Sequence, residues 1–252
     1  MKSKLTITVA SILSVLTLVG VGFAAWVISN PSVSADQNGT ITAETVSDKS
    51  YTLEAVIATD DKIVFGAPAK MEAKNAWLTA DAKTQTEDLS ATLTLTLKYK
   101  DWNYVPVNFS VTMKSKKGGV DDNTVFTDLV SKNYITNPKI SYSKDSKTNT
   151  ADVAMNGAAT EISREAFSQN ASNPNGESDE KTATLEITIT FGWGDHFKVG
   201  TENVNPYVFY NREDKTYEAN HADANTALTA ISGLKDVSYT VTISGTTNVS
   251  GT

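Results

Sequence analysis

The sequence contains two histidines, His196 and His221, and no cysteine, so few side chains are suited to acid–base or nucleophilic chemistry at neutral pH. A hydrolytic triad needs a base beside its nucleophile, and no Gly-x-Ser-x-Gly elbow is present. His196 directly follows Asp195, but adjacent side chains point in different directions and rarely converge on one metal ion. We therefore interpret His196 as a loop histidine and predict neither a catalytic residue nor a metal ligand.

Paired carboxylates occur at Asp60-Asp61 and at Asp121-Asp122. Both pairs lie in predicted turns, where Asp is favoured because its side chain bonds to the local backbone. Neither pair has the Asp-x-Asp/Asn-x-Asp/Asn-Gly spacing of a calcium loop, so opportunistic Ca²⁺ binding is the minor alternative. The sequence thus predicts a protein that is not an enzyme and has no cofactor.

Five aromatic residues close together in the sequence form the densest group of rings in the chain. If the rings are exposed and coplanar, they are suited to stacking on the sugars of a cell-wall or matrix polysaccharide. If they are buried, they plug one end of the fold, and this interpretation is favoured because large aromatic residues near strand ends usually belong to the core. The group, called the aromatic cluster below, comprises Trp193, Phe197, Tyr207, Phe209 and Tyr210.

Residues 1–35 have the pattern of an export signal. After Lys2 and Lys4 no charged residue occurs before Asp36. The apolar run between Lys4 and Asp36 is long enough to cross a hydrocarbon core of about 30 Å as a helix. Small residues at Val33-Ser34-Ala35 fit a cleavage site, and Gly22-Phe23-Ala24 is an earlier candidate. The third alternative is that the segment is not cleaved and stays as a membrane anchor, which would be the protein's one contact with a membrane.

Glycines run into alanine and aromatic residues at Val19-Gly20-Val21-Gly22-Phe23-Ala24-Ala25-Trp26. This end of the apolar segment resembles the signal peptides of the TasA and camelysin group. These are exported matrix proteins of Gram-positive bacteria, and a SipW-type peptidase cleaves their signal peptides. That group usually has an aromatic-Ala-aromatic step directly after the glycines, whereas here two alanines precede Trp26. A second stretch, residues 191–211, is similar to uncharacterised secreted proteins of the same bacteria. The resemblance implies a jelly-roll fold in which the N-terminal segment of one subunit completes a sheet of the next.

Composition limits the class of partner. The formal net charge is -7, and no run of Lys or Arg exceeds Lys116-Lys117, so a nucleic acid would be repelled more than attracted. Without disulfides, an exported domain of this size must be held by its own core. Residues 36–252 are long enough for one large domain, which we predict to be a single β-sandwich with a polar insertion around residues 115–181.

Period-two alternation gives the fold class. Residues 89–99 and 105–113 each place apolar side chains on one face, and the short connection between them predicts one antiparallel hairpin, with Pro106 at an edge or at the strand start. Residues 185–193 and 237–243 repeat the pattern, and residues 222–231 are the best helix. One-sided alternation predicts an all-β fold, namely an antiparallel β-sandwich or jelly roll with one or two short helices. The N-terminal signal or anchor helix precedes this fold in the sequence.

These observations predict a non-enzymatic structural protein at the cell surface or outside the cell, of the kind that builds a biofilm matrix or a fibre. Residues 39–58 are the candidate strand for self-association, because they are β-like and directly follow the signal. An ordinary edge strand paired within its own sheet is the alternative for the same residues. The alternative function is a secreted or membrane-tethered module that binds glycan or cell wall through the aromatic cluster.

Overall fold

A computed structural model describes the chain almost continuously from residue 88 to residue 245 and in short stretches before that. Several predicted features lie outside the described residues: most of the export segment, the cleavage site at Ala35, the Asp60-Asp61 pair and most of the loop around residue 175. The described residues are 23–27, 38–39, 46–47, 51–57, 63–65, 70–71, 78–79, 88–144, 146–170 and 180–245.

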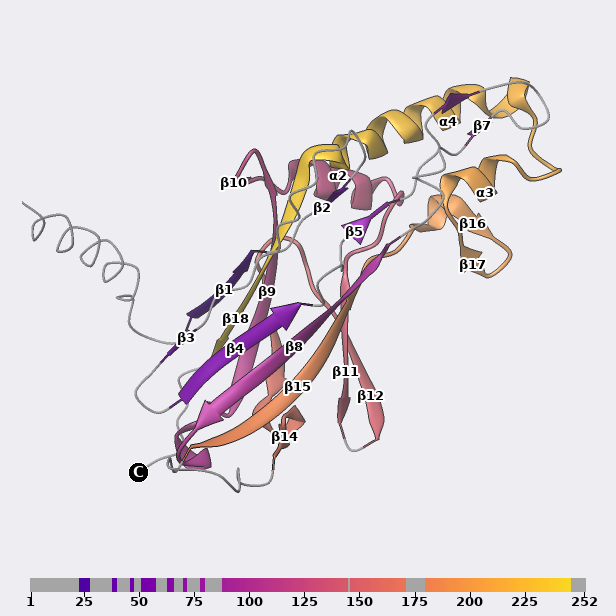
Figure 1. Cartoon of the computed structure of the whole chain (residues 1–252). Helices are drawn as coiled ribbons and strands as arrows, with labels where there is room; N and C mark the ends of the chain where they lie inside the picture. Colours follow the sequence, from indigo (N-terminus) through magenta and orange to yellow (C-terminus); the bar gives the residue numbers. More distant parts are fainter. Residues whose placement is uncertain are drawn as a thin grey trace, which may run out of the picture.

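One antiparallel sheet is built on two ten-residue strands, β8 (Ser90–Tyr99) and β15 (Lys181–Thr190), which pair over their full length. This sheet faces the viewer in Figure 1. In the part of the chain that is described, its strands follow the order β12 (Lys147–Asp152), β11 (Lys139–Lys144), β15, β8, β4 (Tyr51–Ile57) and β3 (Val46–Ser47), with β14 (Ser168–Gln169) also paired to β15.

The second antiparallel sheet is centred on β9 (Asn108–Lys117) and β18 (Val237–Gly245), which pair over nine positions. On its other side, β18 pairs with β1 (Phe23–Val27). The remaining strands are β10 (Val120–Asp121) and β13 (Thr160–Ser163), both paired to β9, and the short pairs β2 (Asn38–Gly39) with β5 (Ile63–Val64), β6 (Lys70–Met71) with β7 (Leu78–Thr79), and β16 (Lys198–Val199) with β17 (Glu202–Asn203).

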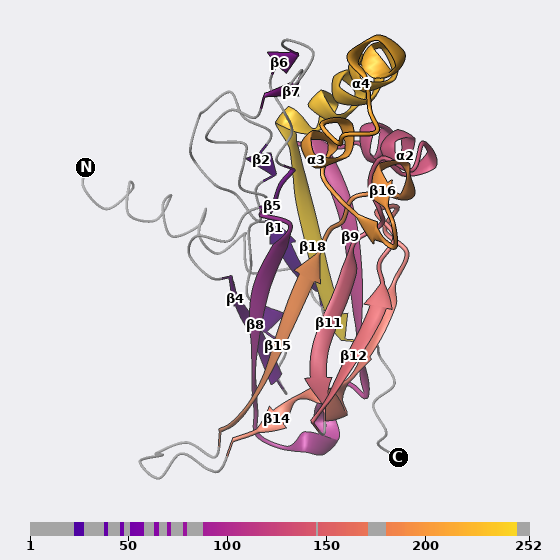
Figure 2. The same cartoon turned by 90° about the vertical axis from the view of Figure 1, so that its right-hand side faces the viewer.

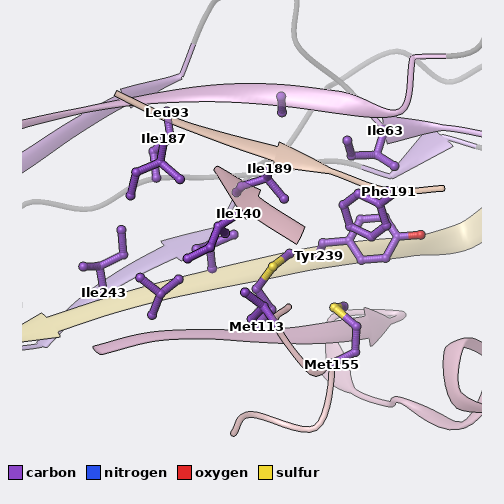
Figure 3. Packing of buried hydrophobic residues seen from close by; sticks show 14 of the residues in the cluster. Ile63, Leu93, Met113, Ile140, Met155, Ile187, Ile189, Phe191, Tyr239 and Ile243 are labelled. Atoms are coloured by element: carbon purple, nitrogen blue, oxygen red, sulfur yellow. The ribbon is translucent and has the colours of Figure 1, made fainter. Parts of the chain in front are cut away.

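The core lies between the two sheets. Figure 3 shows Leu93 and Ile187 of the first sheet on one side of the interior and Met113 and Ile243 of the second sheet on the other. Each of these side chains is at most 1% exposed, and full burial of such a side chain contributes about 1.5–3 kcal/mol. The predicted alternation is therefore confirmed at these strands, as is a mostly β, antiparallel fold with few short helices.

Three helices gather at one end of the molecule, the upper end in Figures 1 and 2. The third of them starts five residues earlier than the sequence pattern predicted, because Thr216 caps its N-terminus by accepting a hydrogen bond from Ala219 N. Among the described residues, the helices are α2 (Thr124–Ser131), α3 (Pro206–Tyr210) and α4 (Tyr217–Ile231), and the 3₁₀ turns are η1 (Trp102–Tyr104), η2 (Arg164–Ala166), η3 (Asp195–Phe197) and η4 (Ser232–Asp236).

The predicted hairpin of β8 with β9 is wrong, because the two strands belong to different sheets. The connection through η1 crosses from one layer to the other, and β9 begins only at Asn108, after Pro106. Arg164 holds this crossing in place by donating from Nη1 to the carbonyl oxygens of Trp102 and Val105, at 2.9 and 2.8 Å. Alternation alone does not distinguish two strands of one sheet from two strands that face each other across a core.

Residues 115–181, predicted to be a polar insertion, supply strands to both sheets. They include β11 and β12 of the first sheet and β13 of the second. Phe126 and Leu129 of α2 are each 1% exposed, and Ile140 of β11 is fully buried. The weak periodicity of this region reflects short strands with many polar residues, and some of its apolar side chains are exposed, as Val120 is at 69%.

Phe23–Val27, which the sequence analysis placed in the helical export segment, forms strand β1. Its five residues pair antiparallel with β18, from Phe23 opposite Ser244 to Val27 opposite Thr240. Aromatic and β-branched residues at both ends of this run favour an extended backbone. No helix among the described residues is long and apolar enough to cross a membrane.

Candidate functional site

The aromatic cluster lies at the helical end of the molecule and is centred on Phe197. The Phe197 ring is fully buried, and it stacks on Tyr134 with ring centroids 5.7 Å apart. Trp193 and Phe209 meet it edge to face at 5.7 and 5.6 Å. Such geometries add to the gain from burial because the positive edge of one ring faces the negative face of another. The cluster therefore closes this end of the core.

A close backbone contact positions the cluster against the segment that follows α2. Gly194 N donates to Tyr134 O and His196 N donates to Asn133 O, both at 3.0 Å. A Cβ atom on Gly194 would lie 2.1 Å from Asn133 O, so a larger residue would force the two segments apart. Glycine is needed here because two backbones approach closely, which explains one residue of the Gly-Trp-Gly-Asp-His-Phe run.

A hydrogen-bonded network of His196, Tyr210 and Asp223 joins η3, α3 and α4. Tyr210 OH donates to Asp223 Oδ2 at 2.6 Å, and His196 Nε2 lies 3.1 Å from Tyr210 OH and 3.4 Å from Asp223 Oδ2. Because the tyrosine has one hydroxyl proton and gives it to Asp223, Nε2 must carry the hydrogen in its contact with the tyrosine oxygen. His196 thus acts as a donor that ties three elements together.

The tyrosines of this end are held in their neutral form. Burial raises the pKa of Tyr210 far above its ordinary value, and the hydrogen bond to Asp223 raises it further. Burial also raises the pKa of Tyr134, whose ring meets that of His196 at 4.8 Å. The ring contact of His196 with Tyr134 and its hydrogen bond to Tyr210 therefore position η3 against the segment after α2 and against α3.

The outer rim of the cluster is cationic. The guanidinium of Arg212 lies 4.8 Å from the centroid of the Phe209 ring, and Lys215 Nζ lies 4.5 Å from it. Arg212 also pairs with Asp214 through both its Nε and Nη2 atoms at 2.9 Å. Both cations therefore lie within cation–π distance of the Phe209 ring.

Four members of the predicted cluster are brought together and buried. Trp193 is 4% exposed and Phe209 8%, while Phe197 and Tyr210 are fully buried; Tyr207, at 36%, is the exposed member. A sugar ring needs an accessible aromatic face, which the four buried rings do not offer. The geometry accordingly favours the packing interpretation of this cluster.

The Asp121-Asp122 pair serves the turn before α2, as Asp commonly does in turns. Asp121 accepts a hydrogen bond from Lys114 Nζ at 2.8 Å, and this bond lowers the pKa of the carboxyl. Asp122 Oδ1 accepts from Thr124 N at 2.9 Å, and this bond likewise lowers its pKa. The described residues contain no group of three or more His, Cys, Asp or Glu side chains placed to hold a metal ion.

A second candidate site is a sheet edge that the sequence analysis did not identify. β18 pairs with β9 on one side over its whole length, and on the other side its residues 240–244 pair with β1. We call this outer side of residues 240–244 the β18 edge. β1 lies within residues 1–35, the segment that the sequence analysis predicts to be an export signal or a membrane anchor. The aromatic and β-branched residues within Phe23–Val27 could have indicated a strand. The longer apolar run around them instead favoured a membrane-crossing helix.

Comparison with known proteins gives no relative for this chain. No protein family model matches it, and neither a curated protein nor a solved structure is significantly similar to it.

Proposed function

We propose that this protein is a non-enzymatic structural subunit outside the cell, and that it assembles with copies of itself by strand addition at the β18 edge. In this proposal the two sheets form a β-sandwich of the jelly-roll type. The subunit is exported by its N-terminal segment, and the mature chain begins after the cleavage site. Strand addition needs an edge whose N–H and C=O groups lack a partner, because the added strand gains affinity through backbone hydrogen bonds.

The pairing of β1 with β18 is the observation that carries the proposal. Cleavage after Ala35 would remove all of Phe23–Val27, and cleavage after Ala24 would remove its first two residues. Either event leaves part or all of the β18 edge unpaired along a strand whose inward residues, Val241 and Ile243, are at most 1% exposed. A long, regular strand with an open edge is a template for pairing with another chain.

The strand that fills the edge is the N-terminal segment of a second mature copy. Of the predicted donor, residues 39–58, the part that forms β4 pairs with β8 over seven positions, and Leu53 is 1% exposed. Releasing β4 would therefore break its seven pairings with β8 and expose Leu53. In the described part of residues 36–50, β2 and β3 contribute two residues each to their pairs, so releasing these two short strands breaks fewer pairings than releasing β4 does. The donor is consequently the part of the predicted segment that precedes β4.

The predicted export signal and the resemblance support the same function. The run from Val19 to Trp26 is similar to the signal peptides of TasA-type matrix proteins, which are exported by Gram-positive bacteria. The negative net charge of -7 favours a soluble subunit between export and assembly. The alternative of a glycan-binding module that uses the aromatic cluster has less support, because four of the five rings are buried.

The experiment compares a chain of residues 36–252 with one of residues 51–252, which lacks the proposed donor but keeps β4. We expect residues 36–252 to form oligomers that grow with concentration, and residues 51–252 to remain a folded monomer. Sedimentation velocity measures the assembly state, and circular dichroism with thermal unfolding verifies that both chains are folded.

A matched control removes the other end of the chain. Residues 36–245, which lack the seven residues after β18, should assemble as residues 36–252 do, because neither the donor nor the edge is altered. Two results would refute the proposal: assembly of residues 51–252 to the same size as residues 36–252, or a monomeric state of residues 36–252 at every concentration.

A further inference from the structure

The β8–β9 turn, at the end of the sheets opposite the helices, displays an aromatic ring that the core does not use. Tyr104 is 57% exposed. Among the Phe, Tyr and Trp rings whose burial the structure describes, Tyr104 and Tyr207 are the exposed ones, and Tyr104 is the more exposed of the two. In Figure 1 this turn lies at the lower end of the molecule, where β8 passes into β9.

Tyr104 stands on a rigid turn. Asp101 caps η1 by accepting a hydrogen bond from Asn103 N at 2.9 Å. Tyr104 N donates to Asp101 O at 3.2 Å, and Val105, which is fully buried, anchors the end of the turn. Arg164, whose side chain is 15% exposed, fixes the carbonyl oxygens on both sides of Tyr104. Because the backbone of the turn is fixed before binding, a ligand that docks on Tyr104 has only the tyrosine side chain to order.

Trp102 gives this turn a second ring. Trp102 packs on Tyr99 with ring centroids 4.9 Å apart, and the guanidinium of Arg164 lies 5.5 Å from the centroid of the Trp102 ring. The Tyr99 hydroxyl in turn donates to Gln169 Oε1 at 3.2 Å. These contacts leave Trp102 half-buried, so Trp102 supports the turn. The ring of the neighbouring Tyr104 is the more accessible of the two.

Charges around the turn are balanced. Lys100 and Asp101 are both exposed, and the Arg164 cation is paired with Glu165 through its Nε atom at 3.2 Å. A polyanion or a polycation therefore meets no net attraction here. The carboxamide of Asn103, exposed beside Tyr104, adds a planar group that can both donate and accept hydrogen bonds.

We propose that the Trp102–Tyr104 turn binds an uncharged sugar of an extracellular polysaccharide. The sugar stacks its C–H face on the Tyr104 ring, and its hydroxyls bond to Asn103 and to the carboxylates of Asp101 and Glu165. An apolar protein partner would require a continuous apolar surface around the ring, and the neighbours of Tyr104 at this turn are instead polar or already packed. The site lies apart from the β18 edge, and because its ligand is found outside the cell, this inference rests on the export proposed above.

The test is affinity electrophoresis of the chain of residues 36–252 in gels that contain a soluble neutral glucan, with a pull-down on insoluble chitin beside it. We expect the wild-type protein to be retarded or retained by at least one of these neutral polymers. Tyr104→Ala should weaken binding about tenfold, and Tyr104→Phe, which keeps the ring, should bind as the wild type does. Tyr207→Ala, which removes the other exposed ring, is the matched control and should change nothing.

Each remaining outcome overturns the proposal. If the wild type binds neither polymer, there is no neutral-sugar site. If Tyr207→Ala weakens binding as much as Tyr104→Ala does, the ligand lies elsewhere, and if Tyr104→Phe fails as Tyr104→Ala does, stacking is not the mode of binding. Because Tyr104 is an exposed side chain, thermal unfolding should be the same for all four proteins and excludes misfolding as a cause.

Discussion

Rings from η3, α3 and the segment after α2 close the helical end of the molecule, whereas the β18 edge is closed by the backbone of one five-residue strand. The aromatic cluster is held by burial, by ring contacts and by the network of His196, Tyr210 and Asp223. β1 can be replaced by another extended strand, because the hydrogen bonds that pair a strand with β18 come from the backbone. The comparison separates an end that stabilises the fold from an edge that, in the proposed function, joins two copies.

The largest effect is expected in the aromatic cluster. Phe197→Ala removes a fully buried ring that touches Tyr134, Trp193 and Phe209. We expect the free energy of unfolding to fall by about 3–5 kcal/mol, the usual cost of truncating a buried Phe. Denaturant unfolding of residues 36–252 measures it, with Tyr207→Ala as the exposed control. A loss below about 1 kcal/mol would show that this cluster does not hold the end of the core.

Gly194→Ala should have the next largest effect. The added Cβ would lie 2.1 Å from Asn133 O, so the segment after α2 must move away. We expect a loss of about 1–3 kcal/mol, as for other overpacked sites. Gly200→Ala is the comparison variant with open space around its Cβ, although its φ of +62° adds a backbone penalty. If Gly194→Ala melts at the wild-type temperature, the two segments are not in contact.

Tyr210→Phe tests the hydrogen-bonded network with the ring left in place. The loss of the hydroxyl removes the bonds to Asp223 and His196, and because Asp223 is half-exposed, water can replace its lost donor. We expect a loss of about 1 kcal/mol in the free energy of unfolding near neutral pH. A variant as stable as the wild type would mean that the network contributes nothing beyond the packing of the rings.

The same variant should change the response to alkali. The folded pKa of Tyr210 is raised above the ordinary value of 10.0, so its contribution to stability is complete below pH 10.0 and is lost as the pH rises toward the folded pKa. Burial raises the pKa of Tyr239 in the same direction, and that residue remains in the variant. Unfolding midpoints measured through this range should fall less steeply for Tyr210→Phe than for the wild type, and equal slopes would contradict the assignment.

The smallest effect is expected at the turn before α2. The pKa of Asp122 is lowered by its hydrogen bond from Thr124 N, so its contribution is present above the ordinary value of 3.8 and is lost as the pH falls through the lowered folded pKa. Asp122→Asn keeps an oxygen acceptor and removes the charge. Its melting temperature should depend slightly less on pH in acid than that of the wild type. An unchanged acid profile would show that the carboxylate charge is irrelevant to this turn.

The sequence predicted the interior well and the connectivity poorly. Alternation at residues 89–99, 185–193 and 237–243 identified inward side chains correctly, because burial on one face leaves a period of two in the sequence. The same pattern says nothing about which strands pair, so β8 and β9 were assigned to one sheet although they lie in two. Pro106 marked the start of the second strand, but the contact of Arg164 with the turn is a long-range interaction with no local signature.

The candidate sites show the same division. Ring density indicated the aromatic cluster, and the preference of large rings for the core predicted its burial. The partners of His196 could not be predicted, because Tyr210 and Asp223 lie on two later helices. The β18 edge was missed because an apolar run long enough for a membrane helix outweighed the strand pattern of Phe23–Val27. A turn such as Trp102–Tyr104 reads as a simple connection until the exposure of its rings is known.

The central claim is that removal of β1 leaves an edge that another copy fills, and competition with β1 itself tests it most directly. Sedimentation velocity of residues 36–252 is measured with and without an excess of a synthetic peptide of residues 21–29, and with a scrambled peptide as control. The account predicts oligomers that the native peptide converts to monomers and the scrambled peptide leaves intact. Oligomers of the same size in the presence of the native peptide would contradict it.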